Sequence, residues 1–124
     1  KDILKEVEWH IESFILKGQP VLAVTRYPTK YMIKNGTTVD ITHYWLTTIQ
    51  RDNVISPSDF TKIYDIFKEF ASTHDKFIFV LEGIEYLSLN FRGKFEISQI
   101  LDKLAEMAES YSIPIYVLFM RSLV

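Results

Sequence analysis

Two carboxylates and an amide follow the most apolar stretch of the chain. Glu82 and Gly83 come directly after the run Phe77–Leu81, and Glu85 and Asn90 follow a little further on. A continuous apolar run of this kind is typical of a strand buried on both faces of a parallel sheet. The carboxyl ends of such strands form the binding crevice of open α/β sheets. Because carboxylate and amide oxygens can hold magnesium or orient a water, this loop is the leading candidate for a site.

The same loop also fits a structural role. Glu82 can cap the turn that follows it, and Glu85 can simply be solvated, since acids near strand ends are common. Gly83 would then serve only to permit the bend. The residue types alone leave both interpretations open.

A second group of polar residues follows another predicted strand, Val21–Thr25. If this strand lies beside Phe77–Leu81, Arg26 faces Glu82 across the crevice. A guanidinium there could bind a phosphate or carboxylate through two parallel hydrogen bonds. It could equally pair with Glu82 or Glu85 as a structural salt bridge. The candidate ligand-binding residues are therefore Arg26, Tyr27, Glu82, Gly83, Glu85 and Asn90.

No complete catalytic set is present in the sequence. The pair Gly93-Lys94 lacks the upstream glycine and the following hydroxyl of a phosphate loop, so it is expected to start the last helix. His10, His43 and His74 lie far apart and share no metal-ligand spacing. A G-x-S-x-G nucleophile elbow is also missing. We therefore expect no catalytic residue, no metal site and no cofactor, and the protein is predicted not to be an enzyme.

Composition narrows the class of protein. With 124 residues, of which 48% are hydrophobic, the chain is expected to form one compact domain over residues 1–124. A net charge of -2 with interspersed signs favours neither nucleic acid nor an anionic membrane as partner. No apolar run approaches the roughly 20 residues that span a bilayer. The absence of cysteine suits the cytoplasm, the lysine and glutamate content hints at a thermophile, and the missing initiator methionine suggests a fragment.

Helical and strand patterns alternate along the chain. Ser56 is predicted to cap a helix with Pro57 at its first position and Asp59 returning a bond, and that helix is expected to stop near His74. The alternation predicts a three-layer α/β sandwich, with a four-stranded parallel sheet and helices on both faces. The predicted strands are Val21–Thr25, His43–Ile49, Phe77–Leu81 and Ile115–Met120; the other predicted helices are Asp2–Lys17 ended by Gly18, a brief one between Pro28 and Asn35-Gly36, and a long one through Ile97 to Ala108.

Several motifs resemble those of a known family. They are G-x-P-V-L-A-V-T-R-Y-P from Gly18, W-L-T from Trp45, I-S-P-S-D-F from Ile55, and L-E-G-I-E-Y-L from Leu81 closed by Asn90-x-x-x-x-Phe95. In this order they resemble the archaeal domain of unknown function 835 family, and the resemblance covers essentially the whole chain. It implies no assigned activity, and it implies relatives that occur alone or joined to signalling and membrane segments.

A more distant likeness is to RecA-like and KaiC-like ATPases. The segment Val7–Thr25 looks like the part that follows a phosphate loop, and Phe77–Gly83 looks like their acid-tipped strand. The likeness implies the strand order second, first, third, fourth, with the phosphate loop lying before Lys1. ATP hydrolysis would then be lost, because an acid without the backbone cradle and its lysine cannot hold the triphosphate.

Two functions follow as hypotheses. The first is a non-catalytic interaction or regulatory module that works with a protein partner or as a homodimer, since an apolar edge strand at Ile115–Met120 invites pairing. The second is a small-ligand or nucleotide-binding domain whose site lies at the carboxyl ends of the first and third strands.

Overall fold

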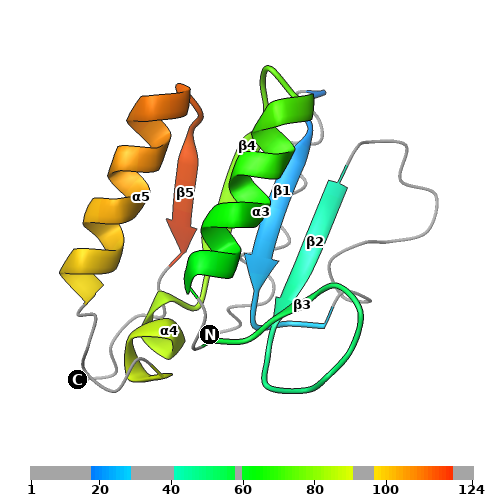
Figure 1. Cartoon of the computed structure of the whole chain (residues 1–124), viewed down its shortest axis with the longest axis vertical. Helices are drawn as coiled ribbons and strands as arrows, with labels where there is room; N and C mark the ends of the chain where they lie inside the picture. The colour runs from blue at the N-terminus through cyan, green and yellow to red at the C-terminus, as the bar shows by residue number, and fades with distance from the viewer. Residues whose placement is uncertain (1–17, 29–40, 58–59, 91–96, 119–124) are drawn as a thin grey trace.

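A parallel β-sheet forms the centre of the protein (Figure 1). The computed structural model describes residues 18–28, 41–57, 60–90 and 97–118. The strands stand in the order β3-β2-β1-β4-β5, and every neighbouring pair is parallel. Their bounds are β1 Val21–Thr25, β2 Ile41–Leu46, β3 Val54–Ile55, β4 Ile78–Glu82 and β5 Ile115–Leu118.

The predicted strand order is confirmed for four strands, but the predicted number of four is wrong. β3 is a fifth strand at the edge beside β2. Trp45 donates its backbone N–H to the Asn53 carbonyl at 3.0 Å, and Thr47 donates to the Ile55 carbonyl at 2.9 Å. Asn53 has a φ of 58°, a left-handed conformation that asparagine tolerates in turns. A strand of two residues is too short to show an alternating pattern, so the sequence does not reveal it.

Two strand boundaries also differ from the prediction. β2 begins before the predicted His43 and ends before the predicted Ile49. It ends early because the chain turns after it, where the Thr47 hydroxyl accepts a bond from the Ile49 N–H at 3.2 Å. β4 lies one residue later than the predicted Phe77–Leu81 and so includes the acid at its tip. The predicted end of the last strand, Met120, lies outside the described residues.

Three helices are described: α3 Phe60–Thr73, α4 Ile84–Asn90 and α5 Ile97–Tyr111. The predicted end of α3 near His74 is confirmed. Its predicted start, with Ser56 as cap and Pro57 as the first helical residue, is not confirmed, because Pro57 lies in a turn before the helix. Asp59 lies outside the described residues. The loop or single turn expected after β4 is helix α4.

α3 and α5 lie on the same face of the sheet (Figure 1). The helices predicted at 2–17 and after Pro28, and the predicted helix start at Gly93-Lys94, lie outside the described residues. The second covering layer of the three-layer sandwich therefore remains a prediction. Gly18 does have the left-handed backbone expected of a helix cap, with a φ of 74°.

The two central strands are buried on both faces, as a parallel sheet requires. Leu22 and Val24 face the cluster formed with α3 and α5, whereas Val21 and Ala23 belong to a second cluster on the opposite face. Phe67 of α3 anchors the first cluster; its ring lies 5.5, 5.4 and 5.3 Å from the rings of Phe77, Phe79 and Tyr111, respectively. This packing holds α3 against β4 and α5.

His43 is a buried polar residue on the second face of the sheet. It is only 2% exposed, and its Nε2 lies 2.8 Å from the hydroxyl of Thr25 on the neighbouring strand. Burial penalises the imidazolium and lowers the pKa of His43 to about 4. The side chain is therefore a neutral hydrogen-bonding group at pH 7.

We expect His43 to make the fold less stable in mild acid. Its pKa is about 4 in the folded chain against an ordinary value of 6.5, so between these values the unfolded chain binds more protons. The stability is complete above pH 6.5 and is lost as the pH falls toward 4, by up to about 3 kcal/mol. Urea unfolding at several pH values measures the loss.

A His43→Gln variant keeps an amide at the position of Nε2 but cannot be protonated, so it should lose less stability than the wild type over this range. His74→Gln, at the end of α3, controls for the removal of an imidazole as such. Equal acid sensitivity of the wild type and His43→Gln would contradict the assignment.

Candidate functional site

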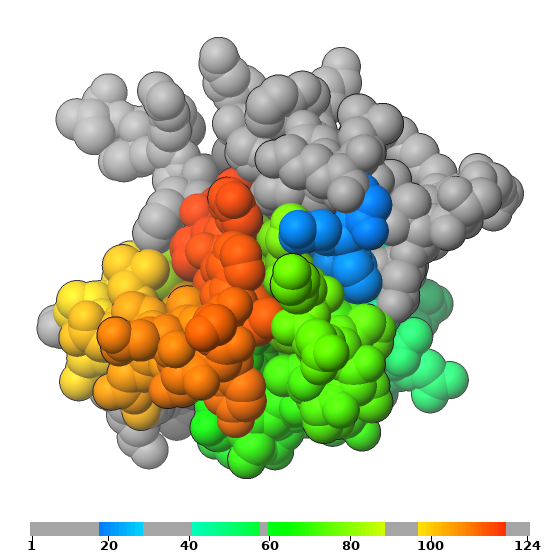
Figure 2. Space-filling model, turned by 90° about the horizontal axis from the view of Figure 1, so that it is seen from above, coloured from blue at the N-terminus to red at the C-terminus, as the bar shows by residue number. Residues whose placement is uncertain are grey.

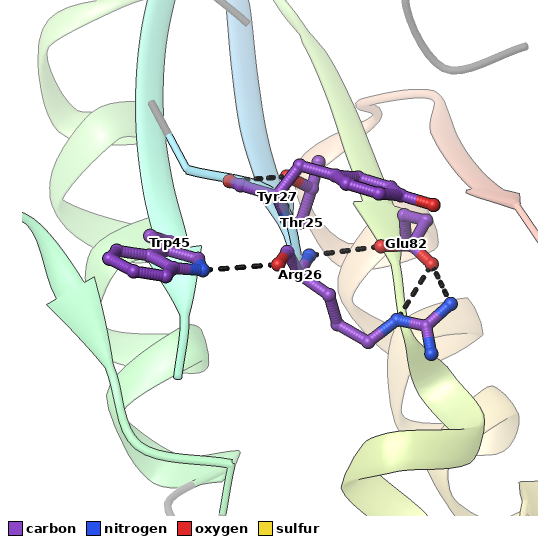
Figure 3. Close-up of polar contacts among 5 residues, drawn as sticks. All are labelled: Thr25, Arg26, Tyr27, Trp45 and Glu82. Carbon is purple, nitrogen blue, oxygen red and sulfur yellow. Dashed lines mark hydrogen bonds and ion pairs between the residues drawn. The ribbon is translucent and has the colours of Figure 1, made fainter. Parts of the chain in front are cut away.

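The carboxyl ends of β1 and β4 bring Arg26 and Glu82 together (Figure 3). The two strands are neighbours in register, with Val24 opposite Leu81. Glu82 is the last residue of β4, and Arg26 follows the last residue of β1. The predicted juxtaposition of these two residues is therefore present in the fold.

Arg26 binds both oxygens of the Glu82 carboxylate. Its backbone N–H donates to Oε1 at 2.9 Å, and its side-chain Nε donates to Oε2 at 2.8 Å. Nη2 forms an ion pair with the same Oε2. The Glu82 side chain is 0% exposed, whereas that of Arg26 is 23% exposed. One arginine thus satisfies a fully buried carboxylate through its main chain and its side chain together.

The local electrostatics favour the charged form of Arg26. Burial opposes the charge on the guanidinium, but the hydrogen bonds and charge of Glu82, with smaller contributions from Tyr27 and Glu85, outweigh it and raise the pKa of Arg26 above its ordinary value. Among the described residues at this edge, Arg26, Glu82 and Glu85 carry one positive and two negative formal charges, so these three groups together disfavour an added anion.

Gly83 leaves room for the arginine side chain. Its φ is 107°, a conformation that residues with a Cβ rarely adopt. A Cβ placed there would lie 2.9 Å from Cγ and 3.1 Å from Cδ of Arg26. Glycine is therefore required both by the turn after β4 and by the path that the Arg26 side chain takes to Glu82.

Trp45 and Thr25 hold the backbone of Arg26 and of Tyr27, respectively, and sequence reasoning missed both roles. The indole N–H of Trp45, from β2, donates to the Arg26 carbonyl at 3.0 Å. The Thr25 hydroxyl accepts the Tyr27 N–H at 3.1 Å. An N–H accepted by a hydroxyl two residues earlier is a common local turn, so the Thr25 contact could have been suspected. The Trp45 contact could not, because it depends on which strands are neighbours in the sheet.

The remaining candidates are only partly joined to this pair. Glu85 lies in the first turn of α4, its Oε1 is buried, and it acts on Arg26 through its charge. Asn90 is the last residue of α4, and its side chain lies outside the described part of the chain. Tyr27 lies beside Arg26, and its main chain contacts Thr25. Contact is thus shown for Arg26, Glu82 and Gly83.

This arrangement is a closed ion pair. Both oxygens of Glu82 already accept bonds from Arg26, and the side chain is 0% exposed, so the carboxylate is not open to a magnesium ion from solvent. Across residues 18–28, 41–57, 60–90 and 97–118, three or more acidic, histidine or cysteine side chains do not gather where they could hold a metal ion. In the same part of the chain, no helix is long and apolar enough to cross a membrane.

Comparison with known proteins gives one match. A family model described as "Protein of unknown function (DUF835)" matches residues 3–111. Neither the curated proteins nor the solved structures gave a match.

Replacing Gly83 tests the packing of Arg26 against it. We expect Gly83→Ala to lower the free energy of unfolding by about 4 kcal/mol, because the new methyl group meets both an unfavourable φ and the Arg26 side chain. The matched control is Gly18→Ala: Gly18 also has a positive φ, 74°, but nothing lies within 4 Å of its added Cβ. That variant should lose only about 1 to 2 kcal/mol.

Chemical denaturation of both variants measures the difference. In a background where Arg26→Ala and Glu82→Ala remove the ion pair, the loss caused by Gly83→Ala should approach that of Gly18→Ala. Equal losses for the two glycine variants in the wild-type background would show that Arg26 does not pack against Gly83.

Proposed function

The chain belongs to the DUF835 family, and we propose that it is a non-catalytic α/β module that acts through protein association or as a regulatory part of a larger archaeal assembly. The contacts that Arg26 makes with both oxygens of Glu82 carry this proposal. An acid at the tip of a central strand is the group that could hold a metal ion or activate water at the crevice. Here that acid is used to bind the adjoining strand.

Opening the pair for catalysis would be costly. Removing one partner from a buried ion pair typically costs about 3 to 5 kcal/mol, because the other charge stays buried without compensation. A metal ion or nucleotide would have to supply that free energy before it bound productively. The pair as it stands joins the ends of β1 and β4, which favours a structural role.

We also infer descent from RecA-like domains with loss of ATP hydrolysis. The order β2-β1-β4-β5 and the acid at the tip of β4 support this relationship. In such an ancestor the acid would have worked with a phosphate loop. In this chain the acid instead accepts the hydrogen bonds of Arg26.

Small-ligand or nucleotide binding remains the rival function, with Arg26, Tyr27, Glu82, Gly83, Glu85 and Asn90 as its residues. One observation favours it: the Arg26 side chain keeps 23% of its surface exposed while only its Nε and Nη2 contact Glu82. The N–H groups of Nη1 could therefore reach a ligand. The net negative charge of the site argues against a phosphate as that ligand.

Calorimetric titration with ATP, GTP and cyclic nucleotides in the presence of magnesium separates the two functions. We expect no heat of binding from the wild-type protein. Heat that is lost in Glu82→Gln and in Glu85→Gln, but kept in the exposed control Glu69→Gln on α3, would contradict the proposal. Circular dichroism shows whether each variant is folded before it is compared.

A further inference from the structure

The Thr25 hydroxyl is the centre of a small group of hydrogen bonds beside the ion pair. Its Oγ1 lies 3.1 Å from the Tyr27 backbone nitrogen, 3.2 Å from the Tyr27 carbonyl oxygen and 2.8 Å from Nε2 of His43. Thr25 is 0% exposed, so solvent does not reach the hydroxyl. Since buried polar groups are satisfied by internal partners, these three contacts account for the hydrogen bonds of the hydroxyl.

The residues of this group lie on the face of the sheet away from α3 and α5. His43 is in register with Ala23, and Thr25 is two residues after Ala23, so all three direct their side chains to the second face. In Figure 2, which is seen from above, α3 (green) and α5 (yellow to orange) both lie on one side of the chain that enters β1 (blue). The bonds of Thr25 are therefore separate from the packing of these helices.

The single hydrogen of the hydroxyl determines which partner donates. A threonine hydroxyl can donate one hydrogen bond and accept two. A backbone N–H can only donate and a carbonyl oxygen can only accept, so the hydroxyl accepts from the Tyr27 N–H and donates to the Tyr27 carbonyl. Only a lone pair is then left for His43. The third contact therefore requires a hydrogen on Nε2 of His43.

The other tautomer of His43 satisfies fewer groups. With its hydrogen on Nδ1, the neutral ring would present Nε2 as an acceptor, and Thr25 would have to turn its only hydrogen to it. The Tyr27 carbonyl would then lose the bond from the hydroxyl. One lone pair of a buried hydroxyl would also lose its donor. Because a bond lost at a buried polar group costs free energy, the Nε2–H form is favoured.

We propose that neutral His43 is the Nε2–H tautomer and that it positions the turn that carries Arg26. The imidazole donates to Thr25, and Thr25 in turn holds the main chain of Tyr27. Arg26 lies between these two residues, and its own N–H donates to Glu82 at 2.9 Å. His43 is a positioning residue, because it acts on the ion pair through Thr25.

β2 thus holds this turn at two points. The indole N–H of Trp45 donates to the Arg26 carbonyl, and His43 acts on the following residue through Thr25 (Figure 3 shows all but His43). Both donors come from the strand that does not carry Glu82. The turn after β1 is therefore held between β2 on one side and the tip of β4 on the other.

Nitrogen-15 NMR of the imidazole rings tests the tautomer, with His74 as an internal control. Nδ1 of His74 lies 3.2 Å from the Phe70 carbonyl, which can only accept, so the hydrogen of neutral His74 is expected on Nδ1. In mildly alkaline buffer, where neutral histidine predominates, we expect a protonated Nε2 in His43 and a protonated Nδ1 in His74. Each signal is assigned by its loss in the corresponding glutamine variant. A hydrogen on Nδ1 of His43 would overturn the proposal.

Amide hydrogen exchange tests the positioning role. Thr25→Val removes the hydroxyl and should make exchange of the Tyr27 amide about tenfold faster, whereas Thr25→Ser keeps the hydroxyl and should restore the slow rate. His43→Leu removes the donor to Thr25 and should also speed exchange of this amide, and His43→Gln, whose side-chain amide can donate, should restore it.

Exchange of the α3 amides corrects each rate for a change in overall stability. In the Thr25→Val background, His43→Leu should cause no further change at Tyr27, because both residues act through the same hydroxyl. A Tyr27 rate that His43→Leu leaves unchanged, or that the two substitutions raise independently, would overturn the positioning role. These outcomes are independent of the proposed function, since neither experiment involves a nucleotide.

Discussion

A fully buried carboxylate must be compensated, and the rest of the structure is arranged around that requirement at Glu82. Arg26 supplies a backbone N–H and a guanidinium to the two oxygens. The guanidinium reaches them only because Gly83 has no side chain, and the indole of Trp45 fixes the Arg26 carbonyl. The contact therefore joins three strands at their carboxyl ends, where a parallel sheet would otherwise leave an open crevice.

The closed ion pair at the crevice bears directly on function. At the ends of β1 and β4, the polar groups that could act on a ligand are used within the fold. A ligand at the crevice would first have to break this internal contact, at a cost in free energy. This cost favours a module without catalytic activity.

The parts of the fold set by local pattern could be predicted from the sequence. The apolar run Phe77–Leu81 indicated a central strand, Val21–Thr25 was placed correctly, and the pairing of Arg26 with Glu82 was one of two open alternatives. The remaining features depend on contacts between distant segments. The short strand β3 has no pattern of its own, and neither the clash at Gly83 nor the bond from Trp45 can be foreseen before the strands are ordered.

A double-mutant cycle on the ion pair tests this account most directly. Arg26→Met and Glu82→Leu are each expected to lower the free energy of unfolding by about 3 to 5 kcal/mol, because each leaves one buried or half-buried charge without its partner. The double variant should be nearly as stable as the wild type, which gives a coupling of at least about 3 kcal/mol between the two residues. Losses that simply add in the double variant would show that the two side chains do not depend on each other, and the account would be wrong.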